Sequence, residues 1–107
     1  MSTIIKPDNL KYSLEVPFFT KKIKLENETY KLGDLIEYDY TAGKGKKITT
    51  AEKFYGVVAE EVTVDGSKVT HGIVYISGVF NKNAIIKGSQ DLEKLEQYSR
   101  PLNIMFK

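Results

Sequence analysis

The sequence predicts a single, mainly β domain, a small barrel with one short helix near the C-terminus. Three observations lead to this prediction. Apolar and polar residues alternate along several short segments, which is typical of half-buried strands. Only one segment, close to the C-terminus, has a helical pattern. The chain has 107 residues and no cysteine, which is enough for one core that folds without disulfides.

The first expected strands lie in the first half of the chain. Residues 22–26 alternate strictly between polar and apolar side chains, which predicts a half-buried strand. Residues 27–29 indicate a turn, after which residues 30–32 resume the alternation. Residues 35–40 form the next strand, with Ile36, Tyr38 and Tyr40 on one face.

The middle of the chain is expected to contain a long loop, a buried strand and a hairpin. Residues 41–53 have few apolar side chains and predict an exposed loop. Residues 54–59 are continuously apolar, which favours a strand covered on both faces. Asp65-Gly66 predicts a type I′ turn between strands at residues 62–64 and 67–70.

The last third is expected to contain the helix between two β segments. Residues 73–80 are rich in strand formers and are interrupted by Gly78. Ser89 is the expected N-cap of a helix that begins at Gln90. Pro101 is expected to end this helix by forcing Arg100 out of helical geometry, and residues 102–106 form the last strand.

Residues 1–20 differ from the rest and are assigned to an N-terminal arm, followed by one β-rich domain over residues 21–107. The arm holds two of the three prolines, has no sustained period and is too apolar for an ordinary solvated tail. Two alternatives stay open: a frayed end that lays a few side chains on the core, or an arm that a partner orders. No long apolar run or cleavage site predicts a membrane span or a secretory signal.

The sequence has no catalytic or metal-binding pattern, so we expect neither enzyme activity nor a cofactor. His71 is the single histidine and cysteine is absent, which excludes the usual zinc sites. Glu60 and Glu61 are adjacent in a strand and therefore point to opposite faces, which does not favour a shared proton. We interpret all three as surface residues.

Lys44, Lys46 and Lys47 lie in a glycine-rich segment that lacks the spacing of a phosphate-binding P-loop. Aromatic residues could stack on bases, but several tyrosines occupy strand positions where packing across strands is favoured: Tyr30, Tyr38, Tyr55 and Tyr75. The net charge of +2 also argues against a dedicated nucleic-acid binder. By elimination, the domain is expected to bind a protein through its surface.

Five segments form an ordered series along the chain. The most specific segment is residues 73–85. Its characteristic residues are a tyrosine, a glycine, a phenylalanine followed by an asparagine, and an alanine: Tyr75, Gly78, Phe80, Asn81 and Ala84. The other four are residues 7–17, 30–36, 54–62 and 91–106. In this order and spacing, the series resembles the lambda-type head decoration proteins of tailed phages.

The resemblance implies a β-clip-like fold and a structural, non-enzymatic virion protein. It further implies a homotrimer that binds the expanded phage head at three-fold and quasi-three-fold sites and stabilises the capsid, after assembly in the host bacterial cytoplasm. The implied partner is the major capsid protein, which the N-terminal arms would bind. The arm residues assigned to capsid binding are Ile4, Ile5, Pro7, Asp8, Asn9, Leu10, Leu14, Val16 and Pro17.

Two other functions stay open from the sequence. One is a small-barrel nucleic-acid-binding module that uses Lys44, Lys46, Lys47 and nearby tyrosines. The other is a scaffold domain that accompanies an enzyme.

Overall fold

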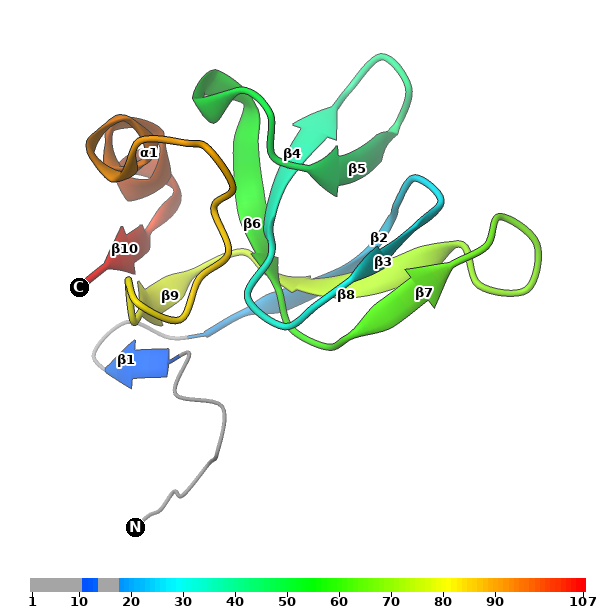
Figure 1. Ribbon diagram of the computed structural model, residues 1–107, viewed down its shortest axis with the longest axis horizontal. Helices are drawn as coiled ribbons and strands as arrows, with labels where there is room; N and C mark the ends of the chain where they lie inside the picture. Colours follow the sequence, from blue (N-terminus) through cyan, green and yellow to red (C-terminus); the bar gives the residue numbers. More distant parts are fainter. Residues whose placement is uncertain (1–10, 14–17) are drawn as a thin grey trace, which may run out of the picture.

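A curled sheet of five antiparallel strands forms the centre of the molecule, and a three-stranded sheet and the helix α1 lie at one end of it (Figure 1). The computed structural model describes residues 11–13 and 18–107. The central sheet has the strand order β2-β8-β6-β4-β5. Its strands are β2 (Thr20–Lys24), β4 (Leu35–Asp39), β5 (Lys44–Lys47), β6 (Phe54–Val58) and β8 (His71–Tyr75). The predicted mainly β fold with one short helix near the C-terminus is confirmed.

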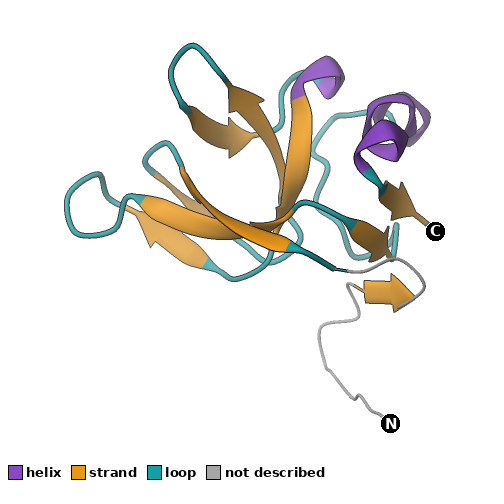
Figure 2. Ribbon diagram, turned by 180° about the vertical axis from the view of Figure 1, so that it is seen from behind, coloured by secondary structure: helices purple, strands orange, loops and turns teal. Residues whose placement is uncertain are grey.

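Two smaller sheets and three helical segments complete the fold (Figure 2). β9 (Gly78–Phe80) lies between β1 (Lys11–Ser13), which is antiparallel to it, and β10 (Ile104–Phe106), which is parallel to it. β3 (Glu28–Tyr30) pairs with β7 (Val62–Val64) in an antiparallel ladder. The helical segments are α1 (Leu92–Ser99) and the 3₁₀ turns η1 (Ala51–Lys53) and η2 (Arg100–Leu102).

The central sheet curls until its two edges touch at one point. Leu25, directly after β2, forms a parallel bridge with Gly45 of β5, and the Glu26 amide donates a hydrogen bond to the Gly45 carbonyl at 2.9 Å. Within the described residues this bridge, rather than a continuous ladder, joins the two edges. The predicted barrel is therefore not closed among the described strands: the sheet is strongly curled, and its edges approach each other at this bridge.

Two apolar clusters lie on opposite faces of β4 and β6. The helix-side core contains Leu35, Ala51, Phe54, Val57, Tyr75, Phe80, Leu95, Ile104 and Phe106. The curled-sheet core contains Ile23, Leu25, Tyr30, Ile36, Val58, Val64 and Val74. Neighbouring residues along a strand point to opposite faces, so Val57 and Val58 enter different cores. This confirms the predicted strand covered on both faces, which ends at Val58 rather than at residue 59.

The predicted exposed loop over residues 41–53 is wrong, because residues 44–47 form β5 and pair with β4. A pattern of apolar side chains does not mark this strand, since its buried residue is a glycine. A Cβ on Gly45 would lie 2.9 Å from Cγ2 of Ile36, so the missing side chain allows the close approach. Ion pairs of Lys46 and Lys47 add to the ladder.

The predicted type I′ hairpin at Asp65-Gly66 is also wrong. Gly66 has a φ of 81°, but Asp65 does not have positive φ, and residues 67–70 form no strand. The Asp65 carboxylate instead accepts hydrogen bonds from the Ser67 and Val69 amides at 2.9 and 3.0 Å and closes a loop. β7 pairs with β3, and Glu28 and Thr29 consequently belong to a strand rather than to the predicted turn.

The helix α1 lies where the sequence places it and ends at Ser99, before Arg100-Pro101 as predicted, but its N-cap and the geometry of Arg100 differ from the prediction. Its N-cap is Asp91 rather than Ser89, since the Asp91 carboxylate accepts a hydrogen bond from the Glu93 amide, whereas Ser89 lies in the preceding turn. Arg100 keeps helical φ and ψ angles of −61° and −41°, contrary to the prediction. Pro101 is accommodated in the first turn of η2, where no amide donor is required, and the chain turns away at Asn103.

Candidate functional site

The N-terminal segment joins the body of the protein at the three-stranded sheet β1-β9-β10. β1 runs antiparallel to β9, with Lys11 opposite Phe80 and Ser13 opposite Val79, and the register shifts between the two pairs. β9 is the middle strand, so it connects β1 to the C-terminal strand β10 (Figure 1). We call this three-stranded sheet the arm root, because residues 1–10 lead into it.

Three aromatic rings pack at the arm root. Phe18 contacts Tyr75 and Phe80 edge to face, with ring centroids 5.7 and 5.3 Å apart. Tyr75 and Phe80 contact each other at 5.5 Å, and Phe80 is fully buried. Backbone contacts add to the rings, since the Ile76 amide donates to the Phe19 carbonyl at 2.8 Å. Phe18 therefore fixes the chain to the helix-side core directly before β2 begins.

Gly78 leaves the space that the Phe18 ring occupies. A Cβ at this position would lie 2.4 Å from Cδ1 of Phe18, and the φ of Gly78 is 140°, a region that side chains rarely adopt. The Gly78 amide donates to the Asn103 carbonyl at 2.9 Å, which ties β9 to the end of η2. Glycine at this position thus serves both the close ring contact and the backbone conformation.

The remaining motif residues shape the turn after β9. The Asn81 side chain accepts a hydrogen bond from the Asn83 amide at 2.9 Å. The backbone carbonyl of Asn81 accepts one from the Ala84 amide, also at 2.9 Å. Ala84 is half-buried against the helix-side core. All five motif residues, Tyr75, Gly78, Phe80, Asn81 and Ala84, accordingly lie in or beside the arm root.

The predicted arm is covered only in part by the described residues. All of its assigned capsid-binding positions lie outside them: Ile4, Ile5, Pro7, Asp8, Asn9, Leu10, Leu14, Val16 and Pro17. Of the rest of residues 1–20, Lys11–Ser13 form β1, Phe18 packs on the core and Thr20 is already the first residue of β2. The part of the arm that precedes β1 is residues 1–10.

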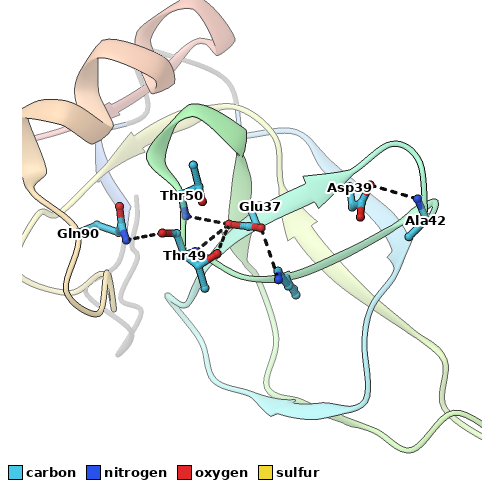
Figure 3. A network of polar contacts seen from close by, with 7 residues as sticks. Glu37, Asp39, Ala42, Thr49, Thr50 and Gln90 are labelled. Carbon is cyan, nitrogen blue, oxygen red and sulfur yellow. Dashed lines mark hydrogen bonds and ion pairs between the residues drawn. The ribbon is translucent and has the colours of Figure 1, made fainter.

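A network of hydrogen bonds surrounds the buried carboxylate of Glu37 in β4. Glu37 Oε1 accepts hydrogen bonds from the Thr49 amide and hydroxyl at 2.8 and 2.9 Å and from the Thr50 amide at 2.9 Å (Figure 3). Gln90 extends the network by donating to the Thr49 carbonyl at 3.0 Å. Burial raises the pKa of Glu37, but these hydrogen bonds outweigh it and hold the pKa below its ordinary value. The network fixes the segment after β5, a structural role that the sequence pattern did not indicate.

The other polar residues considered from the sequence, Glu60, Glu61 and His71, are exposed. Glu60 and Glu61 are exposed after β6. His71 is exposed at the start of β8, and its Nδ1 lies 2.7 Å from the Thr70 hydroxyl. Within residues 11–13 and 18–107, no three histidine or acidic side chains are arranged to hold a metal ion.

The lysines that follow Gly43 are partly neutralised by acidic residues. Lys46 lies 3.9 Å from Glu37, and Lys47 lies 3.4 Å from Glu28 and 4.0 Å from Asp34. Two of the three lysines predicted for nucleic-acid contact are therefore engaged within the molecule.

Three lysines of β2, Lys21, Lys22 and Lys24, lie beside tyrosines of β4 and β6 and were not singled out from the sequence. Their alternation with Ile23 is visible in the sequence. The curl of the sheet decides which strands lie near these lysines, and no local sequence pattern predicts this curl.

No protein-family model matches the chain, and no curated protein matches it significantly. Among the described residues there is no helix with the length and apolarity needed to cross a bilayer.

Proposed function

We propose that this protein is a non-enzymatic decoration subunit of a tailed-phage head, which binds as a homotrimer to the major capsid protein of the expanded head and stabilises it. The ordered series of segments along the chain supports this proposal. So does the agreement between the mainly β body, with its short helix near the C-terminus, and the fold class that the resemblance implies. Its place would be the capsid surface of the virion, reached after assembly in the bacterial cytoplasm.

The observation that carries the proposal is the position of the most specific motif. Its five residues gather at the arm root, where Gly78 makes room for Phe18 and β9 pairs with β1. A motif that holds the start of an N-terminal arm has a clear physical purpose in a protein that binds through that arm. The arm root would then anchor the arm to the body of the protein while the arm binds its partner.

An apolar arm can bind a capsid surface by adding a strand to an exposed sheet edge, with pockets for alternate side chains. Three arms that belong to one trimer bind together, and the effective concentration of the second and third raises the overall affinity. A trimer also matches the symmetry of a three-fold or quasi-three-fold site. A subunit that binds only the expanded shell stabilises that shell by mass action.

The test is addition of the protein to undecorated expanded heads of the phage that encodes it. A variant that lacks residues 1–10 keeps β1 and Phe18, so we expect it to fold with an unchanged circular dichroism spectrum. It should no longer saturate the heads in a sedimentation assay, whereas the full chain should.

A length-matched variant separates the apolar contacts from the mere presence of an arm. Replacing Ile4, Ile5 and Leu10 together by serine retains all 107 positions and removes three apolar side chains. We expect the same loss of head binding. The arm assignment is wrong if either variant still saturates the heads at the concentration that suffices for the full chain.

A further inference from the structure

Three tyrosines meet at the end of the curled sheet where β4 finishes and β6 begins. The Tyr38 ring lies 4.7 Å from the Tyr40 ring and 5.0 Å from the Tyr55 ring, measured between centroids. Tyr38 and Tyr55 are half-buried and pack against the curled-sheet core, which anchors them. Tyr40 is 80% exposed, so an aromatic ring supported by two others projects from the surface.

These tyrosines line a hollow of about 430 Å³ whose other wall is β2. The charged residues in its lining are Lys21, Lys22 and Lys24, with His71 beside them, and no carboxylate takes part. Side chains alternate along β2, so Lys21 shares the face of the buried Ile23, whereas Lys22 and Lys24 lie on the other face of this edge strand. All three lysines are exposed. Within the described part of the chain, no acidic side chain lies within ion-pair distance of any of them. This differs from Lys46 and Lys47, whose charges are paired.

A second hollow of about 340 Å³ shares the three tyrosines and extends the surface toward η1. It contains Lys53 and two acidic residues, Asp39 and Glu52. The Asp39 carboxylate accepts hydrogen bonds from the Thr41 amide at 2.9 Å and from the Ala42 amide at 3.2 Å, so it is tied to its own turn. Figure 3 shows the contact with Ala42. The positive charge of the tyrosine surface is thus concentrated on the β2 side.

We propose that this surface, formed by Tyr38, Tyr40 and Tyr55 with Lys21, Lys22 and Lys24, binds single-stranded nucleic acid. Aromatic rings offer faces on which unpaired bases stack regardless of sequence, and unpaired ammonium groups on both faces of the edge strand β2 attract the phosphates. The hollow is within the roughly 300–1,000 Å³ range of small-ligand sites, so it accepts one or two nucleotides rather than a duplex. Binding here is independent of the arm root and of the proposed attachment to heads.

The first test is a titration of the full chain with a fluorescein-labelled oligothymidylate of about 12 nucleotides, followed by anisotropy, since single-strand sites span roughly 4–16 nucleotides. We expect binding at low salt, with a slope of about −2 for log K against log salt concentration if three phosphates are contacted. Tyr40→Ala should weaken binding by about tenfold, the loss that one base-stacking contact accounts for. Because Tyr40 is exposed, this variant should unfold at the temperature of the original protein.

Matched variants separate the site from general charge. Replacing Lys21, Lys22 and Lys24 by glutamine should flatten the salt dependence. The control is the same replacement at three exposed lysines that line neither hollow, Lys68, Lys82 and Lys94. This control variant should keep most of the salt dependence of binding. Phe19→Ala removes an aromatic ring that is 62% exposed elsewhere and should bind as tightly as the original protein.

Three outcomes overturn the proposal. The first is a lack of oligothymidylate binding at low salt. The second is unchanged binding by Tyr40→Ala, which would reduce the interaction to charge alone. The third is tighter binding of hyaluronate, an acidic polysaccharide without bases, with the same dependence on Tyr40. Tyr40→Ala should still bind expanded heads, because the tyrosine surface and the arm root are different parts of the molecule. Loss of oligothymidylate binding would then say nothing against the proposed decoration function.

Discussion

Glu37 is a carboxylate that is buried without an equally buried cation. Its side chain is 4% exposed, whereas the side chain of Lys46, 3.9 Å away, is 39% exposed. Three hydrogen bonds from Thr49 and Thr50 therefore supply most of the compensation for its burial. They connect the end of β5 to β4 and, through Gln90, to the turn before α1.

The lowered pKa of Glu37 makes part of the stability depend on pH. The unfolded chain binds the proton more readily than the folded one, so the contribution is complete above the ordinary glutamate pKa of about 4.3 and is lost as pH falls through the lower folded value. Glu37→Gln should lower the free energy of unfolding at pH 7 by about 1–3 kcal/mol, because an amide is a weaker acceptor than a carboxylate. Urea unfolding from pH 7 to pH 3 measures both effects.

The exposed Glu61→Gln is the matched control, and it should change neither the stability nor its pH dependence. The difference between the original protein and Glu37→Gln should shrink as pH falls. A difference that stays constant down to pH 3 would show that the charge on Glu37 does not matter.

Gly78 allows a second test at the residue scale. Gly78→Ala places a methyl group against the Phe18 ring and strains the backbone, whereas Gly43→Ala strains the backbone at a φ of 73° with nothing within 4 Å. Gly78→Ala should therefore lower the free energy of unfolding by at least about 1 kcal/mol more than Gly43→Ala, given a cost of about 1–3 kcal/mol for backbone strain alone. Equal losses in urea unfolding would mean that the Phe18 contact adds nothing.

At the scale of elements, α1 is held by its buried face and by its cap. Leu95 is fully buried in the helix-side core, and Leu92 and Tyr98 pack against the same core. Glu93, Lys94 and Gln97 are exposed on the other side of the helix. An eight-residue helix is too short to be stable by itself, so tertiary packing has to supply most of its stability. The cap then decides where the first turn begins.

The two candidate caps predict different mutational effects. Asp91→Ala removes the acceptor for the Glu93 amide and should lower the free energy of unfolding by about 0.5–2 kcal/mol. Ser89→Ala should have little effect, because Ser89 is exposed in the turn before the cap. Thermal or urea unfolding of both variants provides the comparison, and a larger loss from Ser89→Ala would reverse the assignment.

At the scale of the whole molecule, the proposed function specifies a stoichiometry. Every capsid subunit in a closed shell adjoins one three-fold or quasi-three-fold position, and a trimer at each such position gives about one copy of this chain per capsid subunit. Gel densitometry of saturated heads measures this ratio, and cryo-electron microscopy should place three copies around each axis. A ratio well below one, or single copies away from the axes, would contradict the trimer.

The sequence alone predicts the parts of the fold whose signals are local. Alternation identified β2 and β4, a continuous apolar run identified β6 as covered on both faces, and a helical pattern near the C-terminus located α1. It also located the motif around Gly78, although not the reason for the glycine. Each of these follows from residues that are neighbours in the chain.

Only the tertiary structure decided the elements whose partners are distant in sequence. β5 is a strand because Gly45 fits against Ile36 and Leu25, and β3 is a strand because β7 lies beside it, although neither segment has a strand pattern of its own. The tyrosine surface likewise exists because the curl of the sheet brings the lysines of β2 to Tyr38, Tyr40 and Tyr55. Local periodicity predicts which face of a strand is buried. The free energy of strand pairing depends instead on which strand lies beside it, and the whole chain determines that neighbour.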